Sequence, residues 1–194
     1  MSRIVRVTLC LLLPCVAFRA PAQAVSASQS PKVDVAVTMV AERSLRSATP
    51  DNFWMEGGSI ELGTNSWRGF GIAANISGTH TGAISGTTIP LSLVTATFGL
   101  RYRWHADHRS SIYCEGLIGE ANGFKSLFPV ITGAQTSANG FASQLGGGLD
   151  YRLSERFAIR VAEAAWQHTQ LPNGTNNVQN DLRLGAGLVV RFGH

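Results

Sequence analysis

The segment Asp181–Phe192 constrains the fold most, because apolar side chains alternate with polar or small ones along its whole length. An alternation with a period of two is typical of a strand that has one face against hydrocarbon and the other against polar groups. The apolar face holds Leu182, Leu184, Ala186, Leu188, Val190 and Phe192, and the other face holds Asp181, Arg183, Gly185, Gly187, Val189 and Arg191. A half-buried strand of a water-soluble sheet would show the same alternation. This segment alone therefore leaves a membrane barrel and a soluble barrel equally open.

The N-terminus has the three-part layout of a secretory signal peptide. A basic start precedes an apolar run from Val7 to Phe18, and Ala22-Gln23-Ala24 supplies the small residues of a cleavage site. The apolar run is too short to cross a hydrocarbon layer of about 30 Å as a helix, and Pro14 interrupts it. We therefore predict a cleaved signal peptide at residues 1–24.

Cleavage of this signal changes the charge balance of the chain. The whole sequence has 16 basic and 12 acidic side chains and a net charge of +4. Three of the arginines and none of the acids lie in residues 1–24, so the mature chain is nearly neutral. Nucleic-acid binding needs a clustered basic face, and no nucleic-acid partner is expected. Cys114 has no intramolecular partner after cleavage, so we expect no disulfide and a small apolar residue on a strand face.

The remainder of the chain repeats the strand alternation. We expect residues 25–31 to form a flexible lead-in and residues 32–192 to form one domain. Its strands are expected at about 32–42, 53–62, 67–77, 91–104, 110–120, 141–152, 157–168 and 181–192. Short and long connections alternate, and the longest expected loop is Ala121–Asn139. In an up-and-down barrel this places the long loops at one end and the tight turns at the other.

The aromatic side chains favour a membrane barrel over a soluble eight-stranded carrier, which would point its apolar residues into a cavity. One group of aromatics lies next to the short turns or the C-terminus, and a second lies near the opposite rim. Two such belts are expected at the two membrane interfaces. The first group is Trp67, Phe70, Tyr102, Trp104, Tyr151, Phe157 and Phe192, and the second is Phe53, Trp54, Phe141 and Trp166.

These features resemble the small bacterial outer-membrane β-barrel family, the porin-like group that includes the transmembrane domains of OmpA and OmpX. The resemblance covers about Lys32 to Phe192 and includes a last strand that ends Val-Val-Arg-Phe192. It implies an all-β fold, an eight-stranded antiparallel up-and-down transmembrane β-barrel, in the bacterial outer membrane after secretion through the inner membrane. Outer-membrane lipids would surround it, and no second domain is expected. Phe192 would be the assembly-signal aromatic that the outer-membrane assembly machinery reads, although Gly193 and His194 follow it here.

Seven charged residues are expected to face the lumen, which in an eight-stranded barrel is just wide enough for side chains to fill. They are Glu61, Arg101, Glu115, Asp150, Arg160, Arg183 and Arg191. Buried charges need partners, so we expect ion pairs. If the hairpin between the sixth and seventh strands centres on Glu155, Asp150 faces Arg160 across the ladder. A polar plug is therefore favoured over a conducting pore.

The seventh strand contains a conflict. With Phe157, Ile159 and Val161 outward, a regular strand would point Glu163 to lipid, where a charge is costly. We predict a β-bulge near Val161-Ala162 that turns Glu163 inward and Trp166 outward. A different register for the whole strand is the alternative.

The sequence says more about location than about activity. We expect a structural or envelope-integrity role, with a small porin-like channel or a loop-mediated surface adhesin as alternatives. Exposed loops commonly carry binding function, so an unknown surface ligand is possible there, and Phe124, Leu127 and Phe128 would contact it or cap the barrel mouth.

A lipid A-modifying enzyme is the less favoured hypothesis. Such an enzyme needs a histidine beside a serine or acids near the outer rim. His80 and His168 lie at that rim, and His168 with Glu163 could support acid-base work, but no serine is fixed beside them. No histidine pair has metal-ligand spacing with a third donor. We therefore expect no enzymatic activity, no catalytic or metal-binding residue and no cofactor.

Overall fold

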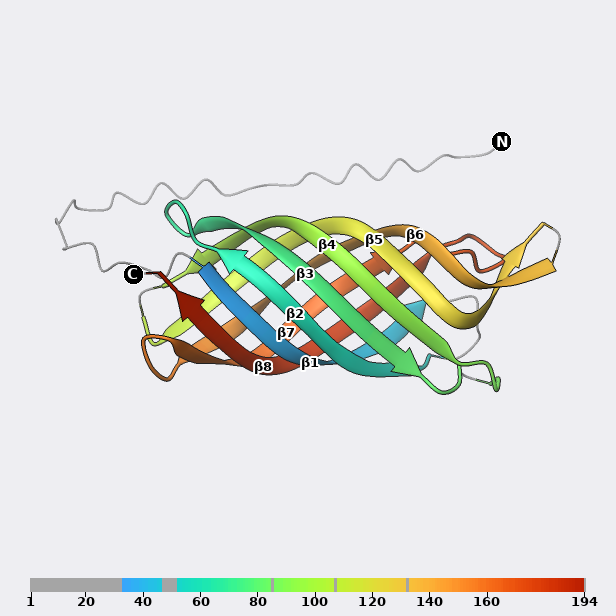
Figure 1. The fold of residues 1–194 in the computed structure, drawn as a ribbon, viewed down its shortest axis with the longest axis horizontal. Coiled ribbons are helices and arrows are strands. Elements are labelled where there is room, and N and C mark those ends of the chain that lie inside the picture. The colour runs from blue at the N-terminus through green and yellow to red at the C-terminus, as the bar shows by residue number, and fades with distance from the viewer. Residues whose placement is uncertain (1–32, 47–51, 85, 107, 132, 194) are drawn as a thin grey trace, which may run out of the picture.

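The chain forms a closed antiparallel barrel of eight strands in a computed structural model that describes residues 33–46, 52–84, 86–106, 108–131 and 133–193. The strands are β1 (Val33–Arg46), β2 (Trp54–Thr64), β3 (Phe70–Thr81), β4 (Leu91–Trp104), β5 (Ser110–Val130), β6 (Gly133–Arg152), β7 (Phe157–Thr169) and β8 (Gln179–Phe192) (Figure 1). Neighbours in sequence pair with each other, and β1 closes the barrel against β8. The predicted signal at 1–24 and lead-in at 25–31 lie outside the described residues. In the ranges that the structure describes, no helix is long and apolar enough to cross a membrane.

The two ends of the barrel differ in their connections: one end has only tight turns, whereas the other has three longer connections and the extended β5–β6 hairpin. Tight turns join β2 to β3, β4 to β5 and β6 to β7 at the end where β8 finishes, which we call the turn end (Figure 1). The other end is the loop end. Arg68 and Gly69 have positive φ values of 48° and 90° in the β2–β3 turn, and Trp67 pairs with Phe70 across it. The third strand therefore begins at Phe70 and not at Trp67 as the alternation predicts.

The predicted loop Ala121–Asn139 is wrong, because most of this stretch continues the barrel strands. β5 runs to Val130 and β6 begins at Gly133, and the two strands stay paired with a register shift between Phe124 and Phe128. The resulting hairpin extends past the rest of the loop end (Figure 1). The sequence does not predict this extension. A hairpin outside the hydrocarbon layer needs no continuous apolar outward face, so the apolar-polar alternation that identifies the other strands is absent there.

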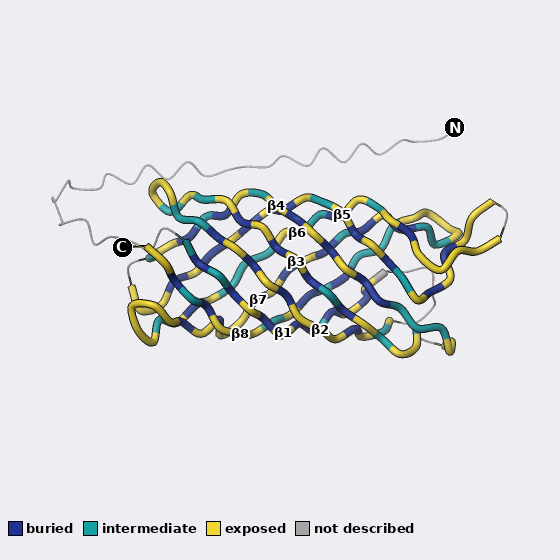
Figure 2. The backbone as a smooth tube through the Cα atoms, in the orientation of Figure 1, coloured by how far each residue is buried: buried dark blue, intermediate teal, exposed yellow. Residues whose placement is uncertain are grey.

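Burial alternates from residue to residue along the strands (Figure 2). On β8, Leu184 and Leu188 are 40% and 63% exposed on the outside, whereas Arg183, next to Leu184, is fully buried. Arg101 on β4 is likewise buried, and Leu149 on β6 faces outward. The apolar side chains point away from the barrel axis, which is the reverse of a soluble carrier and confirms the predicted facing.

The predicted bulge on β7 is confirmed. Pairing with β6 passes from Leu149↔Ala162 directly to Asp150↔Arg160, so Val161 is left out of the register. Pairing with β8 shifts over the same stretch, between Arg160 and Glu163. The extra residue turns the carboxylate of Glu163 into the lumen.

Aromatic rings form a contiguous patch on the outside of the turn end. The ring centroids of Phe70 and Tyr102 are 4.6 Å apart, and those of Tyr102 and Trp104 are 4.4 Å apart. At the loop end the outward aromatics are Trp54, Phe141 and Trp166. Phe53 departs from the predicted belt, because it packs against an apolar cluster of buried residues.

Candidate functional site

Tyr113 lies at the centre of the charged lumen. β5 carries its side chain inward, where it is buried. Three guanidinium groups surround the ring, with the Cζ atoms of Arg160, Arg101 and Arg103 at 4.5, 4.6 and 5.2 Å from its centroid. Such cation–π contacts strengthen when water is excluded. The Tyr113 hydroxyl donates a hydrogen bond to Glu163 Oε2 at 3.2 Å.

Glycines opposite these large side chains leave the space that the large side chains fill. Gly148 pairs with Tyr113 across β5 and β6, and a Cβ atom at Gly148 would lie 2.8 Å from the Tyr113 hydroxyl oxygen. Gly63 on β2 likewise leaves room for the Arg101 guanidinium. Since side chains fill the interior of an eight-stranded barrel, a large group on one strand requires a small one opposite.

Arg101 joins three carboxylates that come from three other strands. Its Nε and Nη2 donate to Glu115 Oε2 at 3.0 and 2.5 Å, and its Nη1 donates to Asp34 Oδ1 at 3.2 Å. Nη2 also pairs with Glu61. The neighbouring inward residue Arg103 donates to the second oxygen of Asp34 at 3.0 Å.

Arg160 makes the second set of ion pairs. Its Nε donates to Asp150 Oδ1 at 3.1 Å, so the predicted cross-strand pair forms. Its Nη1 contacts Glu61 at 2.8 Å and Glu163 at 2.7 Å. Asp150 also accepts a hydrogen bond from Arg103 at 2.6 Å. Because Glu61 and Asp150 each have two arginine partners, the pairs join into one network.

Arg183 extends the ion network toward the loop end, where it hydrogen-bonds two uncharged side chains in addition to its contact with a carboxylate. Its Nη1 donates to the side-chain oxygens of Gln144 at 3.1 Å and Asn75 at 3.3 Å. Its Nη2 lies 3.3 Å from Glu163 Oε1. Buried charges are tolerated when paired and hydrogen-bonded in this way. The ion network can therefore fill and close the lumen.

The structure places all seven lumen charges named from the sequence inside the barrel, none more than 3% exposed. It brings six of them into the ion network: Glu61, Arg101, Glu115, Asp150, Arg160 and Arg183. Arg191 lies nearer the turn end, where its Nη2 donates to Ser111 Oγ at 3.4 Å. Phe192, the predicted assembly aromatic, faces outward at that end.

Five further interior residues are not among the seven charges expected in the lumen, although the strand period places them on the inward faces. They are Asp34, Glu42, Arg103, Tyr113 and Asp181, all buried. Each lies an even number of positions from an inward residue on its own strand. The alternation of side-chain direction along a strand is therefore sufficient to predict that these side chains point inward.

The residues considered for acid-base catalysis are not brought together. Glu163 is buried in the ion network, while His168 Nδ1 lies 2.9 Å from the amide oxygen of Asn180. On the outer wall, His80 Nδ1 and Ser92 Oγ are hydrogen-bonded at 2.9 Å. The structure therefore does not assemble the His168–Glu163 pair that the enzyme hypothesis needs.

Toward the loop end the interior becomes apolar. Its cluster of buried residues is Met55, Leu93, Ala121, Phe128, Ala138, Ala142 and Leu171. Phe128 from the β5–β6 hairpin and Leu171 from the β7–β8 connection also line a cavity of about 230 Å³. Phe128 therefore packs into the mouth, whereas Leu127 is 57% exposed.

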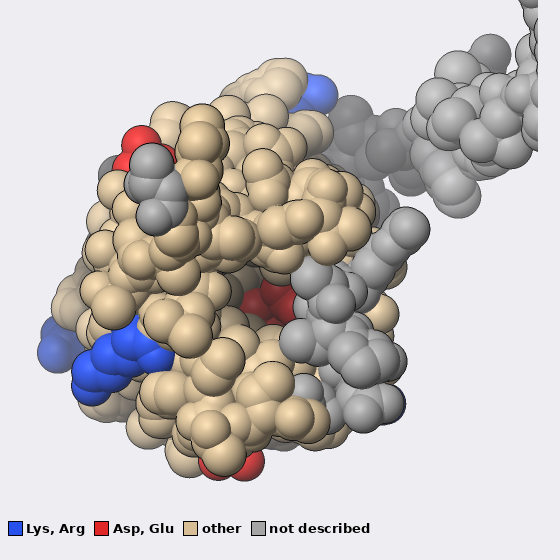
Figure 3. All heavy atoms as spheres, turned by 90° about the vertical axis from the view of Figure 1, so that its right-hand side faces the viewer, with Lys and Arg blue, Asp and Glu red and all other residues tan. Residues whose placement is uncertain are grey.

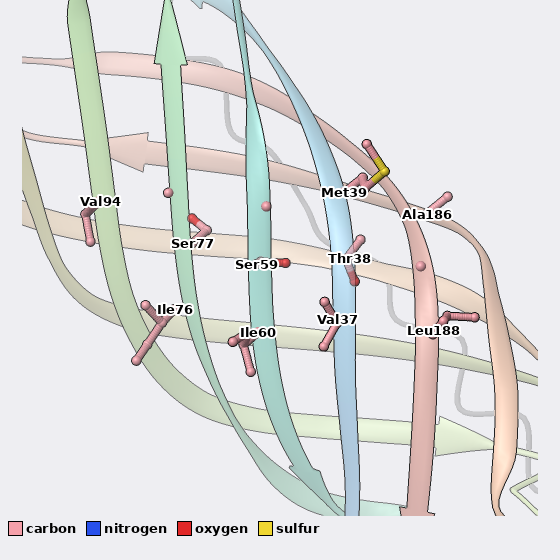
Figure 4. A pocket seen from close by; sticks show the side chains of 13 residues that line it. Val37, Thr38, Met39, Ser59, Ile60, Ile76, Ser77, Val94, Ala186 and Leu188 are labelled. Carbon is pink, nitrogen blue, oxygen red and sulfur yellow. The ribbon is translucent and has the colours of Figure 1, made fainter.

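A groove of about 670 Å³ lies on the outer wall and crosses β8, β1, β2, β3 and β4 (Figure 4). One cross-strand row places Gly58 and Gly78 between Met39 and Val94. The two glycines leave a hollow between the larger side chains. The groove belongs to the apolar wall and is separate from the ion network.

Comparisons with known proteins agree with this architecture. A family model described as "Outer membrane protein beta-barrel domain" matches residues 8–192. The crystal structure of Neisserial surface protein A is similar, with a TM-score of 0.60 and 13% identity over 82% of this chain and 97% of that chain. The attachment invasion locus protein Ail of Yersinia pestis is similar, with a TM-score of 0.55 and 16% identity over 82% and 99%.

The same Ail protein in complex with the heparin analogue sucrose octasulfate has a TM-score of 0.52 and 19% identity over 81% of this chain and 99% of that chain. No curated protein sequence matches the chain. At these identities the structural likeness establishes the fold and does not extend to activity.

Proposed function

We propose a structural, envelope-maintaining role with a closed lumen for this chain, which belongs to the outer membrane protein beta-barrel domain family and lies in the bacterial outer membrane. The observation that supports the closed lumen is the ion network around Tyr113. Arg101, Arg160 and Tyr113 are each 1% exposed or less, and their contacts reach strands on all sides of the interior. When paired side chains fill the interior, no continuous water-filled passage remains through which a solute could cross.

Electrical recording tests the closed lumen. The purified barrel in a planar lipid bilayer should show no ohmic conductance steps. The double variant Arg101→Ala, Glu61→Ala removes a paired acid and base from the centre of the network and should produce small steps. Leu100→Ala, which truncates the neighbouring outward side chain, should remain silent. Steady steps from the wild-type barrel would reject the closed lumen in favour of a channel.

The envelope role is tested in the bacterium that makes the protein. Cells that lack it should become more permeable to large apolar dyes and more sensitive to detergent. Restoration by a variant in which the hairpin 125–137 is replaced by a short turn would assign the effect to the barrel. Unchanged permeability in the deletion strain would argue against this role.

A surface-binding role is the second candidate, and the projecting β5–β6 hairpin is the observation that favours it. Leu127, Val130 and Ile131 are exposed at its tip, and exposed apolar groups on a loop platform commonly mark interaction sites. The four loop-end segments 47–53, 82–90, 121–139 and 170–178 contain one acid, Asp51, and one base, Lys125, and so carry no net charge. We therefore propose an uncharged or apolar partner rather than a polyanion. Loss of adhesion to cell surfaces on shortening the hairpin, with assembly intact, would support this role.

We further propose that residues 1–24 are removed as a signal peptide and that outer-membrane lipids cover the apolar wall, including the groove over Gly58 and Gly78. Phe192 is proposed as the aromatic that the assembly machinery reads. A Phe192→Ala variant should then insert less efficiently than Phe157→Ala, which removes another outward aromatic at the turn end. Equal insertion of the two variants would reject the proposal that the assembly machinery reads Phe192.

A further inference from the structure

The described part of the lumen carries two more negative than positive charges. Seven buried carboxylates accompany five buried arginines. Five of these carboxylates form ion pairs with arginine: Asp34, Glu61, Glu115, Asp150 and Glu163. The remaining two are Glu42 and Asp181, for which no ion pair occurs within the described ranges. Arg191 likewise has no ion pair in these ranges, but it lies near the turn end, where it donates to Ser111. The negative charge on the loop-end side of the ion network is therefore carried by Glu42 and Asp181.

Glu42 and Asp181 lie together on the loop-end side of the ion network. The β1–β8 register sets Glu42 opposite Arg183 and Ser44 opposite Asp181. The two acids are thus diagonal neighbours on the same inner face, a separation that their side chains can span. Both accept hydrogen bonds from neutral donors, Glu42 from the Thr79 hydroxyl at 3.2 Å and Asp181 from Ser44.

Gln167 adds a third oxygen to this pair. It lies directly opposite Asp181 on β7, is 1% exposed, and its Nε2 donates to Glu42 Oε1 at 2.9 Å. Its own Oε1 is buried and has no hydrogen-bond partner in the part of the chain that the structure describes. Buried acceptors without a donor are rare in native proteins. The two carboxylates outweigh the single positive charge of Arg183 opposite Glu42. Together with the free amide oxygen, they have the electrostatics of a cation site.

We propose that Glu42, Asp181 and Gln167 bind one calcium ion inside the barrel. The two charges of Ca²⁺ match the two excess carboxylates. The donors are all oxygen atoms, which Ca²⁺ prefers, and its flexible coordination can be completed by water. The cluster has no thiolate or imidazole to select a softer metal. The described residues hold no group of three or more His, Cys, Asp or Glu that could bind a metal, so the amide oxygen takes the place of a third acid.

The position of this site gives a bound ion a structural effect. Figure 3 looks onto the loop end and shows a hollow with acidic atoms at its base. Glu42 and Asp181 are the inward acids nearest that end of β1 and β8. Since β1 and β8 form the closing seam of the barrel, a bound ion would link the first and last strands. This effect is independent of the envelope role proposed above.

The binding test uses the assembled barrel in a zwitterionic detergent, free of anionic lipid and stripped with EDTA. Equilibrium dialysis against radioactive calcium should give one saturable site, and calcium should raise the thermal unfolding midpoint because it binds the folded state. Asp181→Asn and Glu42→Gln should each weaken binding at least about tenfold, because affinity depends on the charge of the ligands. Glu56→Gln, which neutralises an exposed acid on β2, should bind calcium as the wild type does.

Two results would overturn the calcium site. One is the absence of saturable binding to the wild-type barrel; if Asp181→Asn then raises the unfolding midpoint in EDTA, a proton rather than a metal balances the two acids. The other is undiminished binding by Asp181→Asn, which would place the calcium elsewhere. If the charge variants fail to assemble, Gln167→Leu retains both carboxylates and should still weaken binding. Wild-type affinity in that variant would reject the proposed ligand set.

Discussion

At the scale of single residues, the ion network around Tyr113 joins arginines to carboxylates, and glycines on neighbouring strands leave room for its largest side chains. Tyr113 fits against Gly148, and three arginines pack on its ring. Each of these arginines reaches at least two carboxylates. Removal of one arginine therefore breaks ion pairs to several carboxylates at once.

Arg160→Met tests this dependence, because it removes the charge while retaining much of the side-chain volume. Asp150, Glu61 and Glu163 would each lose an ion pair, and breaking a buried pair typically costs about 3–5 kcal/mol. Urea unfolding of the assembled barrel, followed by tryptophan fluorescence, measures the change in the free energy of unfolding. Arg109→Ala, at an exposed turn position, should change it by less than about 0.5 kcal/mol. Similar losses in both variants would mean that the network does not stabilise the barrel.

Gly148→Ala tests the fit of the Tyr113 ring. The added methyl group would lie 2.8 Å from the ring and hydroxyl of Tyr113 and 2.7 Å from the backbone oxygen of Ala162, and overpacking of this kind costs about 1–3 kcal/mol. Gly116→Ala is the matched control, since its new Cβ would lie 3.9 Å from the nearest atom, on Leu145. The same unfolding measurement should separate the two variants. Equal stability would show that the ring moves aside at no cost.

The inward direction of Arg101 and Asp150 could be predicted from the sequence, because strand parity fixes the direction of each side chain. The identity of most partners could not. Arg101 bonds Asp34, which is 67 residues away in the chain, and such contacts cross the lumen. They depend on strand tilt and stagger, which the alternation of apolar and polar residues does not specify.

At the scale of strands, the apolar-polar pattern predicts a strand where its outward face must be apolar against lipid. The pattern does not predict a strand that extends into water. β4 has its predicted limits, Leu91–Trp104, because its apolar face lies in the wall. The β5–β6 hairpin does not follow from the pattern, because its outward face beyond Phe124 meets water and not lipid, although Phe128 on the inward face is buried. The bulge on β7 could be predicted, since a regular strand would have exposed Glu163 to lipid.

Deletion of single residues from β7 tests the bulge. Without Val161, Ala162 would take the vacant outward position, and Arg160 and Glu163 would both still face inward. This variant should assemble, as shown by the heat-dependent shift of folded barrels in electrophoresis. Deletion of Ala164 instead reverses every later side chain, turning Trp166 inward and Gln167 outward, because a one-residue slip inverts both faces. Assembly of the Ala164 deletion, or failure of the Val161 deletion, would contradict the assigned register.

At the scale of the whole molecule, the barrel combines an apolar outer wall, a central ion network and an apolar cluster beneath the loop end. Family membership and the apolar wall agree on the outer membrane as its location. The proposed closed lumen and the proposed calcium site concern only the interior, and neither is needed for the location. All three depend on one arrangement, in which apolar side chains face lipid and charged side chains face the axis.

Collision accessibility of nitroxide labels in lipid vesicles tests this arrangement most directly. Labels are placed on single cysteines that replace Phe98, Leu145 and Leu188, all outward and exposed on the wall, in a Cys114→Ser background. A fourth label replaces Ile131 at the hairpin tip. Oxygen concentrates in hydrocarbon, so it should enhance the spin relaxation of the three wall labels more than a water-soluble nickel chelate does. At position 131 the nickel chelate should have the larger effect. Equal access of the nickel chelate to the wall labels and to the tip would contradict a lipid-facing wall.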